Sequence, residues 1–310
     1  HIAGLGNMGE LNAPNQVGKP GYEGVLNKRV ATVASLLQAH GYHPYMAGKW
    51  HVTKQLKPDG DKSNWPRQRG FDRFYGTIIG AGSLFDPWTL TRDEKAITPA
   101  NDPEYKPKQY YYTDAVSDNA VKFANEHDKS NPFFMYVSYT AAHWPMHALP
   151  KDIAKYEGKY DGGYAPAYEA RLKKMKSLGL IDPSWKIPGP IGDWSKVEKK
   201  EWESACMEVY AAMVDNMDQG VGRIVQALKA NGQLDNTLIL FFQDNGGCSE
   251  GRGRNARKDA AKPRKPMGKN ELQTEMVPTH TRAGKPVMTG PDHMPGPSAT
   301  YIAYGRNWAN

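Results

Sequence analysis

The sequence is poor in cysteine and has no long apolar run, and each absence excludes a class of protein. Among 310 residues only Cys206 and Cys248 are cysteines, too few for a disulfide framework and not in a Cys-x-x-Cys metal spacing. No apolar run approaches the roughly 18 to 20 residues of a membrane-spanning helix, and the mean hydropathy is -0.70. With 39% hydrophobic and 24% charged residues, the composition is that of a globular protein and not of a disordered chain.

The chain also lacks an initiator methionine, since it begins with His1. We expect a processed or cut chain, so the absence of a signal peptide excludes no compartment. An excess of 40 Lys and Arg over 33 Asp and Glu gives a net charge of +7. This charge suits an anionic partner without identifying one.

Helical and extended patterns alternate three times along the chain. The helical patterns are marked by a stop at Gly41, an N-cap at Thr113, and a capping box at Ser195 and Glu198. The predicted strands that follow them are 42–48, 133–137 and 237–242. The last two are unbroken apolar runs, which is typical of strands buried on both faces. We therefore predict an α/β fold with a mostly parallel central sheet and helices on both faces.

Polar side chains follow each predicted strand. Lys49 and His51 follow the first strand and His143 follows the second. Asp244 and Asn245 follow the third. Because the carboxyl ends of parallel strands meet at one edge of a sheet, we expect these five residues around a common pocket. Cations facing hard oxygen ligands suit an oxyanion ester bound beside a divalent cation.

Each motif also has a plainer interpretation. Asp-Asn-Gly-Gly at 244–247 is by itself a common turn sequence. His143, before Trp144 and Pro145, is typical of a loop histidine bonded to backbone. The coincidence of complementary chemistry at three strand ends favours a site.

The residues 41–51 resemble the second signature of the sulfatase family, in which a Gly-Tyr strand leads into Gly-Lys-Trp-His. Three further motifs follow in that family's order: Arg-Gly-Phe-Asp at 69–72, His-Trp-Pro at 143–145 and Asp-Asn-Gly at 244–246. The resemblance runs along the whole chain and is closest to bacterial arylsulfatases. It implies an alkaline-phosphatase-like fold and the hydrolysis of sulfate monoesters.

The resemblance also implies roles for the five residues. Asp244 and Asn245 would ligate calcium, while Lys49, His51 and His143 would surround the sulfate and the nucleophile. That nucleophile would be a formylglycine made from Cys or Ser. We expect a sulfated small molecule or sulfated glycan as substrate, no nucleic-acid or membrane partner, and a periplasmic or extracellular location. The sequence does not indicate an oligomeric state.

The family's nucleophile motif, Cys/Ser-x-Pro/Ala-x-Arg, has no counterpart before Lys49. The segment 248–252 has the terminal Cys and Arg, but it lacks the middle Pro or Ala and follows the other motifs. We therefore predict that residues 1–310 are the central fragment of a sulfatase catalytic domain. Alone, this fragment is expected to bind calcium weakly and to turn over nothing.

Residues 246–297 lose all periodicity and are rich in Lys and Arg, which predicts an irregular basic insertion within that domain. Two alternative functions remain open. One is a phosphate or phosphonate ester hydrolase of the same superfamily. The other is a noncatalytic binder of anionic polysaccharides, which would use the basic loop. Nucleic-acid binding is disfavoured because no aromatic side chains interleave with the charges of this loop.

Overall fold

The computed structural model describes residues 3–5, 13–243, 245–251, 253–257, 262–305 and 308. The chain divides into two compact units, and each is described by itself. The sheet unit comprises His1–Ala141, Asn216–Thr237 and Pro263–Gly284. The helical unit comprises Ala142–Asp215, Leu238–Lys262 and Lys285–Asn310. Within the described ranges, no helix combines the length and apolar character needed to cross a membrane.

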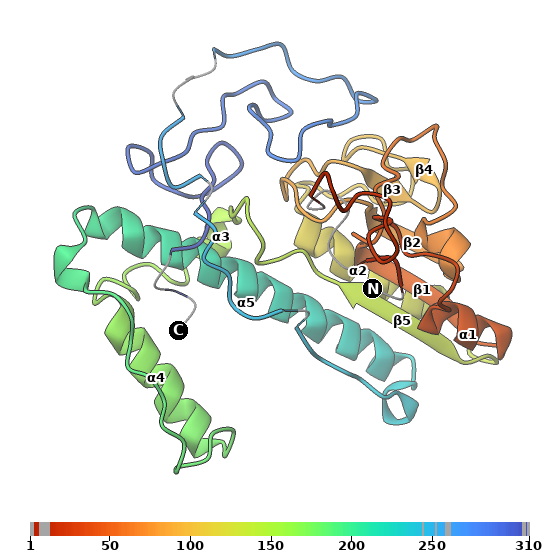
Figure 1. The fold of residues 1–310 in the computed structure, drawn as a ribbon, viewed down its shortest axis with the longest axis horizontal. Coiled ribbons are helices and arrows are strands. Elements are labelled where there is room, and N and C mark those ends of the chain that lie inside the picture. Colours follow the sequence, from red (N-terminus) through yellow and green to blue (C-terminus); the bar gives the residue numbers. More distant parts are fainter. Residues whose placement is uncertain are drawn as a thin grey trace. The chain divides into compact units, whose positions relative to one another are not determined.

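A five-stranded sheet forms the framework of the sheet unit (Figure 1). Its strands are β1 (His43–Lys49), β2 (Arg73–Thr77), β3 (Leu90–Arg92), β4 (Lys95–Ala96) and β5 (Phe133–Ser138). The strand order is β4-β3-β2-β1-β5. β1 pairs in parallel with β2 and β5, whereas β3 and β4 add antiparallel pairs at one edge. The sheet is mixed and its long strands are parallel, which confirms the predicted α/β class.

Helices flank both faces of β1. The helical segments that lie wholly within the unit are α1 (Val33–Ala39), α2 (Tyr112–Glu126), η2 (Pro66–Arg69) and η4 (Leu234–Asn236). Successive residues of a strand point to opposite faces of the sheet. The Tyr45 ring contacts Phe123 of α2 at a centroid distance of 5.8 Å, whereas Met46 is buried in a cluster with Ala34 of α1. The two helices therefore cover opposite faces, as the sequence predicts.

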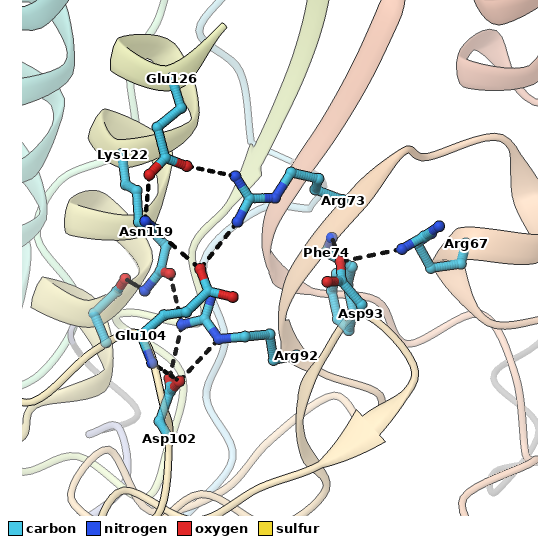
Figure 2. Close-up of polar contacts among 11 residues, drawn as sticks. Arg67, Arg73, Phe74, Arg92, Asp93, Asp102, Glu104, Asn119, Lys122 and Glu126 are labelled. Atoms are coloured by element: carbon cyan, nitrogen blue, oxygen red, sulfur yellow. Dashed lines mark hydrogen bonds and ion pairs between the residues drawn. The ribbon is translucent and has the colours of Figure 1, made fainter.

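An ion-pair network with a buried centre at Arg92 and Asp102 joins β2 and β3 to α2 (Figure 2). Arg92 is 5% exposed and donates to both carboxylate oxygens of Asp102, at 2.7 and 2.9 Å. The same guanidinium lies 2.9 Å from Asn119 Oδ1. Arg73 of β2 lies 2.6 Å from Glu126 at the end of α2. Because the Arg92 and Asp102 charges are withdrawn from water, each depends on the other to remain satisfied.

The long helix α5 (Lys200–Ala230) contributes residues to both units. From Asn216 onward it belongs to the sheet unit, where Gly220 lies against α2. A Cβ at Gly220 would lie 2.1 Å from Ser117 Oγ, so this contact needs a residue without a side chain. α5 ends shortly before Gly232, whose φ of +69° is left-handed.

Two predicted helix starts are wrong. The capping box at Ser195 and Glu198 is not formed, because Ser195 lies inside the short η3 (Trp194–Lys196). Asp193 is the N-cap of η3, and its Oδ1 accepts hydrogen bonds from the backbone N–H and the hydroxyl of Ser195. Thr113 does not cap α2, because the N-cap position is Tyr111, two residues earlier. Tyr111 is fully buried, and its side chain makes no cap hydrogen bond.

The third predicted strand is also wrong. Residues 237–242 form no strand among the described residues, and the apolar side chains from Leu238 to Phe242 are 49% to 84% exposed. β5 lies at the sheet edge and is half-buried, with Tyr136 37% exposed, and not buried on both faces as predicted. An apolar run becomes a strand only where a neighbour supplies the backbone hydrogen bonds, and the described strands pair without this one.

The helical unit is built on α3 (Pro150–Ile153), α4 (Tyr164–Ser177), η3 and the first half of α5. Its buried centre is the Glu203 carboxylate, which is 4% exposed. Glu203 accepts hydrogen bonds from Tyr164 Oη at 3.1 Å and Trp308 Nε1 at 3.0 Å, and it pairs with Arg254. These bonds tie α4, α5 and the C-terminal coil together.

Candidate functional site

Lys49 and His51 lie at the carboxyl end of β1. Beyond the last strand residue the chain continues along β2, because Trp50 N donates to Thr77 O at 2.9 Å and His51 N donates to Ile78 O at 3.0 Å. Hydrogen bonds to the end of β2 and to the residue after it therefore hold the backbone that carries Lys49 and His51.

Close approach of the strands fixes the backbone on the other side of Lys49. Gly48 has a φ of +122°, and a Cβ there would lie 2.0 Å from Ser138 O of β5. Ser138 Oγ donates to Lys49 O at 2.7 Å. The Gly in Gly-Lys-Trp-His is therefore a packing requirement that places the lysine.

His51 has an unusual backbone conformation. Its φ of +55° lies in the left-handed region that few non-glycine residues adopt. Its imidazole lies against Gly80, where a Cβ would be 2.2 Å from the ring Cε1. Strained residues of this kind cluster at functional sites, so the observed outlier supports a functional assignment.

The loop 78–89, which follows β2, carries a buried carboxylate that no sequence motif marks. Asp86 is 3% exposed and accepts from Arg282 Nε at 2.8 Å and Gln273 Nε2 at 2.9 Å. Burial raises the pKa of Asp86, and Arg282 opposes the rise. No local signal in the sequence predicts this cluster, because Gln273 and Arg282 lie 187 and 196 positions after Asp86.

These contacts attach part of the basic segment 246–297 to the sheet unit. Its residues 263–284 belong to that unit, and the remainder belongs to the helical unit. The described residues of this segment form isolated β-bridges, and they form no helix and no strand of several residues.

His143 belongs to the helical unit and is oriented by its neighbour. Its Nδ1 lies 2.6 Å from Trp144 O, and the two rings are 4.9 Å apart. A carbonyl oxygen only accepts, so Nδ1 carries the hydrogen and Nε2 is the nitrogen suited to proton exchange. Trp144 is 5% exposed and donates its indole N–H to Glu250. This anchoring fixes the plane of the histidine ring.

Asp244 lies outside the described residues. Asn245 is exposed in the helical unit, and its Nδ2 donates to Gly246 O at 2.9 Å, which leaves Oδ1 as the atom suited to a cation. Because residues 237–242 form no strand, Asp244 and Asn245 do not follow a strand end as predicted.

A metal site is not complete within the described ranges, where no group of three or more His, Cys, Asp and Glu side chains could hold an ion. Calcium takes about 6 to 8 oxygen ligands. A carboxylate at 244 and an amide oxygen at 245 have suitable chemistry and would supply part of such a shell.

The structure brings together Lys49 and His51 in one unit and describes His143 and Asn245 in the other. A cavity of about 370 Å³ in the helical unit is lined by none of them. Its walls are Pro150, Ile153, Ala154, Glu157, Ala205, Glu208, Met294, Pro295, Gly296 and Pro297.

Comparison with known proteins adds independent information. Residues 8–277 match the Sulfatase family model. An uncharacterised sulfatase of Schizosaccharomyces pombe is 38% identical over 265 residues, covering 79% of this chain and 47% of that protein. An arylsulfatase of Klebsiella aerogenes is 31% identical over 252 residues, covering 79% of this chain and 53% of that protein.

A solved structure described as Ps i-CgsB in complex with k-i-k-neocarrahexaose is 26% identical, with a TM-score of 0.49. The similarity covers 72% of this chain and 42% of that one. The chain spans about half the length of both relatives named above. Since the family match extends over most of its residues, the chain belongs to the sulfatase family.

Proposed function

We propose that the protein hydrolyses sulfate monoesters, and that this chain supplies Lys49, His51 and His143 to the reaction and Asp244 and Asn245 to a calcium site. The observation that supports this most directly is the end of β1. There, in a member of the sulfatase family, Lys49 and His51 lie at the carboxyl end of β1. Hydrogen bonds to Thr77 and Ile78 on one side and to Ser138 of β5 on the other hold their backbone.

Lys49 provides a fixed positive charge for the sulfate oxygens. A charge pair at 4 Å contributes on the order of 4 kcal/mol at an effective dielectric constant near 20. The charge helps most where negative charge builds up in the transition state, because preorganised groups need no rearrangement at that moment.

The two histidines handle protons and orientation. His143, with Nδ1 bonded to Trp144 O, presents Nε2 to donate a proton to the departing oxygen. His51 orients the nucleophile from its fixed position against Gly80. General acid–base groups contribute roughly 100- to 10,000-fold each.

Calcium held by Asp244 and Asn245 would withdraw charge from a sulfuryl oxygen when bound. The formylglycine motif has no counterpart before Lys49, so the 310-residue chain by itself is expected to show no turnover.

The test uses the natural gene product, co-expressed with an enzyme that generates formylglycine and assayed on 4-nitrophenyl sulfate and 4-nitrophenyl phosphate. We expect hydrolysis of the sulfate, and a loss of about 100- to 1,000-fold in kcat/KM for Lys49→Ala. Lys57→Ala, at an exposed lysine of the same unit, is the control and should keep full activity. Preference for the phosphate ester would favour the phosphatase alternative, and unchanged activity of Lys49→Ala would refute the assignment.

A further inference from the structure

We propose that the segment 171–191 of the helical unit is a docking surface for a sulfated polysaccharide. The choice of sulfate as the anion rests on the proposed function.

The segment carries a concentration of exposed cations. Lys155 in the same unit is paired, with Asp152 at 3.0 Å and Asp215 at 2.6 Å. The cations of the segment have no such carboxylate partner among the described residues, and its own Asp182 accepts from Ser184. These exposed cations are Arg171, Lys173, Lys174, Lys176 and Lys186. Arg171 lies over the ring of Tyr168, at 5.7 Å from its centroid, so its guanidinium keeps its charge without a carboxylate partner. An anionic partner would therefore displace no carboxylate from these five side chains.

The cations of α4 surround the helix. At 100° per residue, the four positions from Arg171 to Lys176 spread over roughly 220° of its circumference. The remaining side carries Tyr168, Leu172 and Met175, which are half-buried, and Tyr168 donates its hydroxyl to Pro188 O of the returning chain. A flat membrane can contact only one side of such a helix, whereas a flexible polyanion can wrap around it. The geometry therefore favours a linear polymer.

The chain that returns along α4 (Figure 1) adds exposed apolar side chains. Trp185 is 62% exposed and is followed directly by Lys186. Leu178, Leu180 and Ile191 are 61%, 62% and 56% exposed. Large exposed apolar patches mark interaction sites, and the four exposed apolar side chains all belong to this one segment. An indole offers a flat apolar face with a polar edge, which fits the C–H face of a sugar ring beside a charged substituent.

The experiment measures binding of the 310-residue chain to fluorescently labelled dextran sulfate, with unsulfated dextran, anionic phospholipid vesicles and single-stranded DNA as comparison ligands. The variant replaces Lys173, Lys174, Lys176 and Lys186 by Gln. The matched control replaces four exposed lysines of the sheet unit by Gln and changes the net charge equally: Lys57, Lys95, Lys106 and Lys108. A third variant, Trp185→Ala, tests the aromatic contact.

We expect the fourfold variant to lose about tenfold or more in affinity at low salt and to show a shallower dependence on salt, because fewer counterions are released. The control should change by less than about twofold, and Trp185→Ala should weaken binding at all salt concentrations. Circular dichroism of each variant checks that the fold is kept.

Equal weakening of variant and control would overturn the proposal, since it would reduce the effect to net charge. Tighter binding of vesicles or DNA than of dextran sulfate would assign the surface to another partner and would also overturn it. Binding needs no turnover, so the outcome is independent of the activity test. A chain that binds dextran sulfate while its natural gene product cleaves no sulfate ester would refute the proposed function alone.

Discussion

The contact between His51 and Gly80 allows the role of His51 to be tested without removing the histidine. A Cβ at Gly80 would lie 2.2 Å from the ring Cε1, and ordinary van der Waals contact begins at 3.4 Å. Gly80→Ala must therefore displace the imidazole by about 1.2 Å, the difference of these distances. Misplacing a catalytic group by about 1 Å costs on the order of 100-fold in rate.

We expect Gly80→Ala to lower kcat/KM of the natural gene product toward 4-nitrophenyl sulfate by about 100-fold. Its free energy of unfolding should change by less than about 1 kcal/mol, because the φ of residue 80 suits alanine and the obstacle is a side chain. Gly222→Ala is the matched control: Gly222 lies exposed in α5 with nothing within 4 Å of the added Cβ. The control should keep its activity and gain about 0.5 to 1 kcal/mol of stability.

A double-mutant cycle isolates the cause. If Gly80→Ala acts through His51, it should have no further effect in the His51→Ala background. Full activity of Gly80→Ala, or additive losses in the double variant, would refute a role for His51 in the reaction.

Three further predictions concern stability. Gly48→Ala should cost at least about 2 kcal/mol in urea unfolding, because its Cβ would meet Ser138 O at 2.0 Å and its φ is +122°; a cost below about 0.5 kcal/mol would contradict the strand packing. Asp102→Ala should cost about 3 to 5 kcal/mol by leaving the Arg92 charge buried without its partner, and a midpoint of urea unfolding equal to wild type would show the pair to be unimportant. Burial lowers the pKa of His147 to about 3. Below about pH 6.5 the histidine of the unfolded chain is therefore protonated while that of the folded chain stays neutral. The free energy of unfolding then falls by up to about 1.4 kcal/mol per pH unit as the pH drops from 6.5 toward 3. His147→Gln should flatten this slope in thermal unfolding between pH 7 and 4.5, and an unchanged slope would show that other groups dominate.

Local patterns in the sequence predicted much of the sheet unit. The helical spacing before Gly41 and the extended segment after it correspond to α1 and β1, and Gly41 has the left-handed φ of +83° expected of a helix stop. The apolar run at 133–137 corresponds to β5. These elements depend on periodicity and on turn residues, which act over a few positions of the chain.

Other features arise only when distant segments meet. The Asp86 cluster joins residues nearly two hundred positions apart, and the conformation of His51 depends on the absence of a side chain at Gly80. The run 237–242 has the composition of a strand but no partner among the described strands. The sequence by itself determined which segments can be helical or extended, because that preference is local; only the tertiary structure decided which of them pair and which stay exposed, because a strand or a buried charge is stable only when another part of the chain satisfies it.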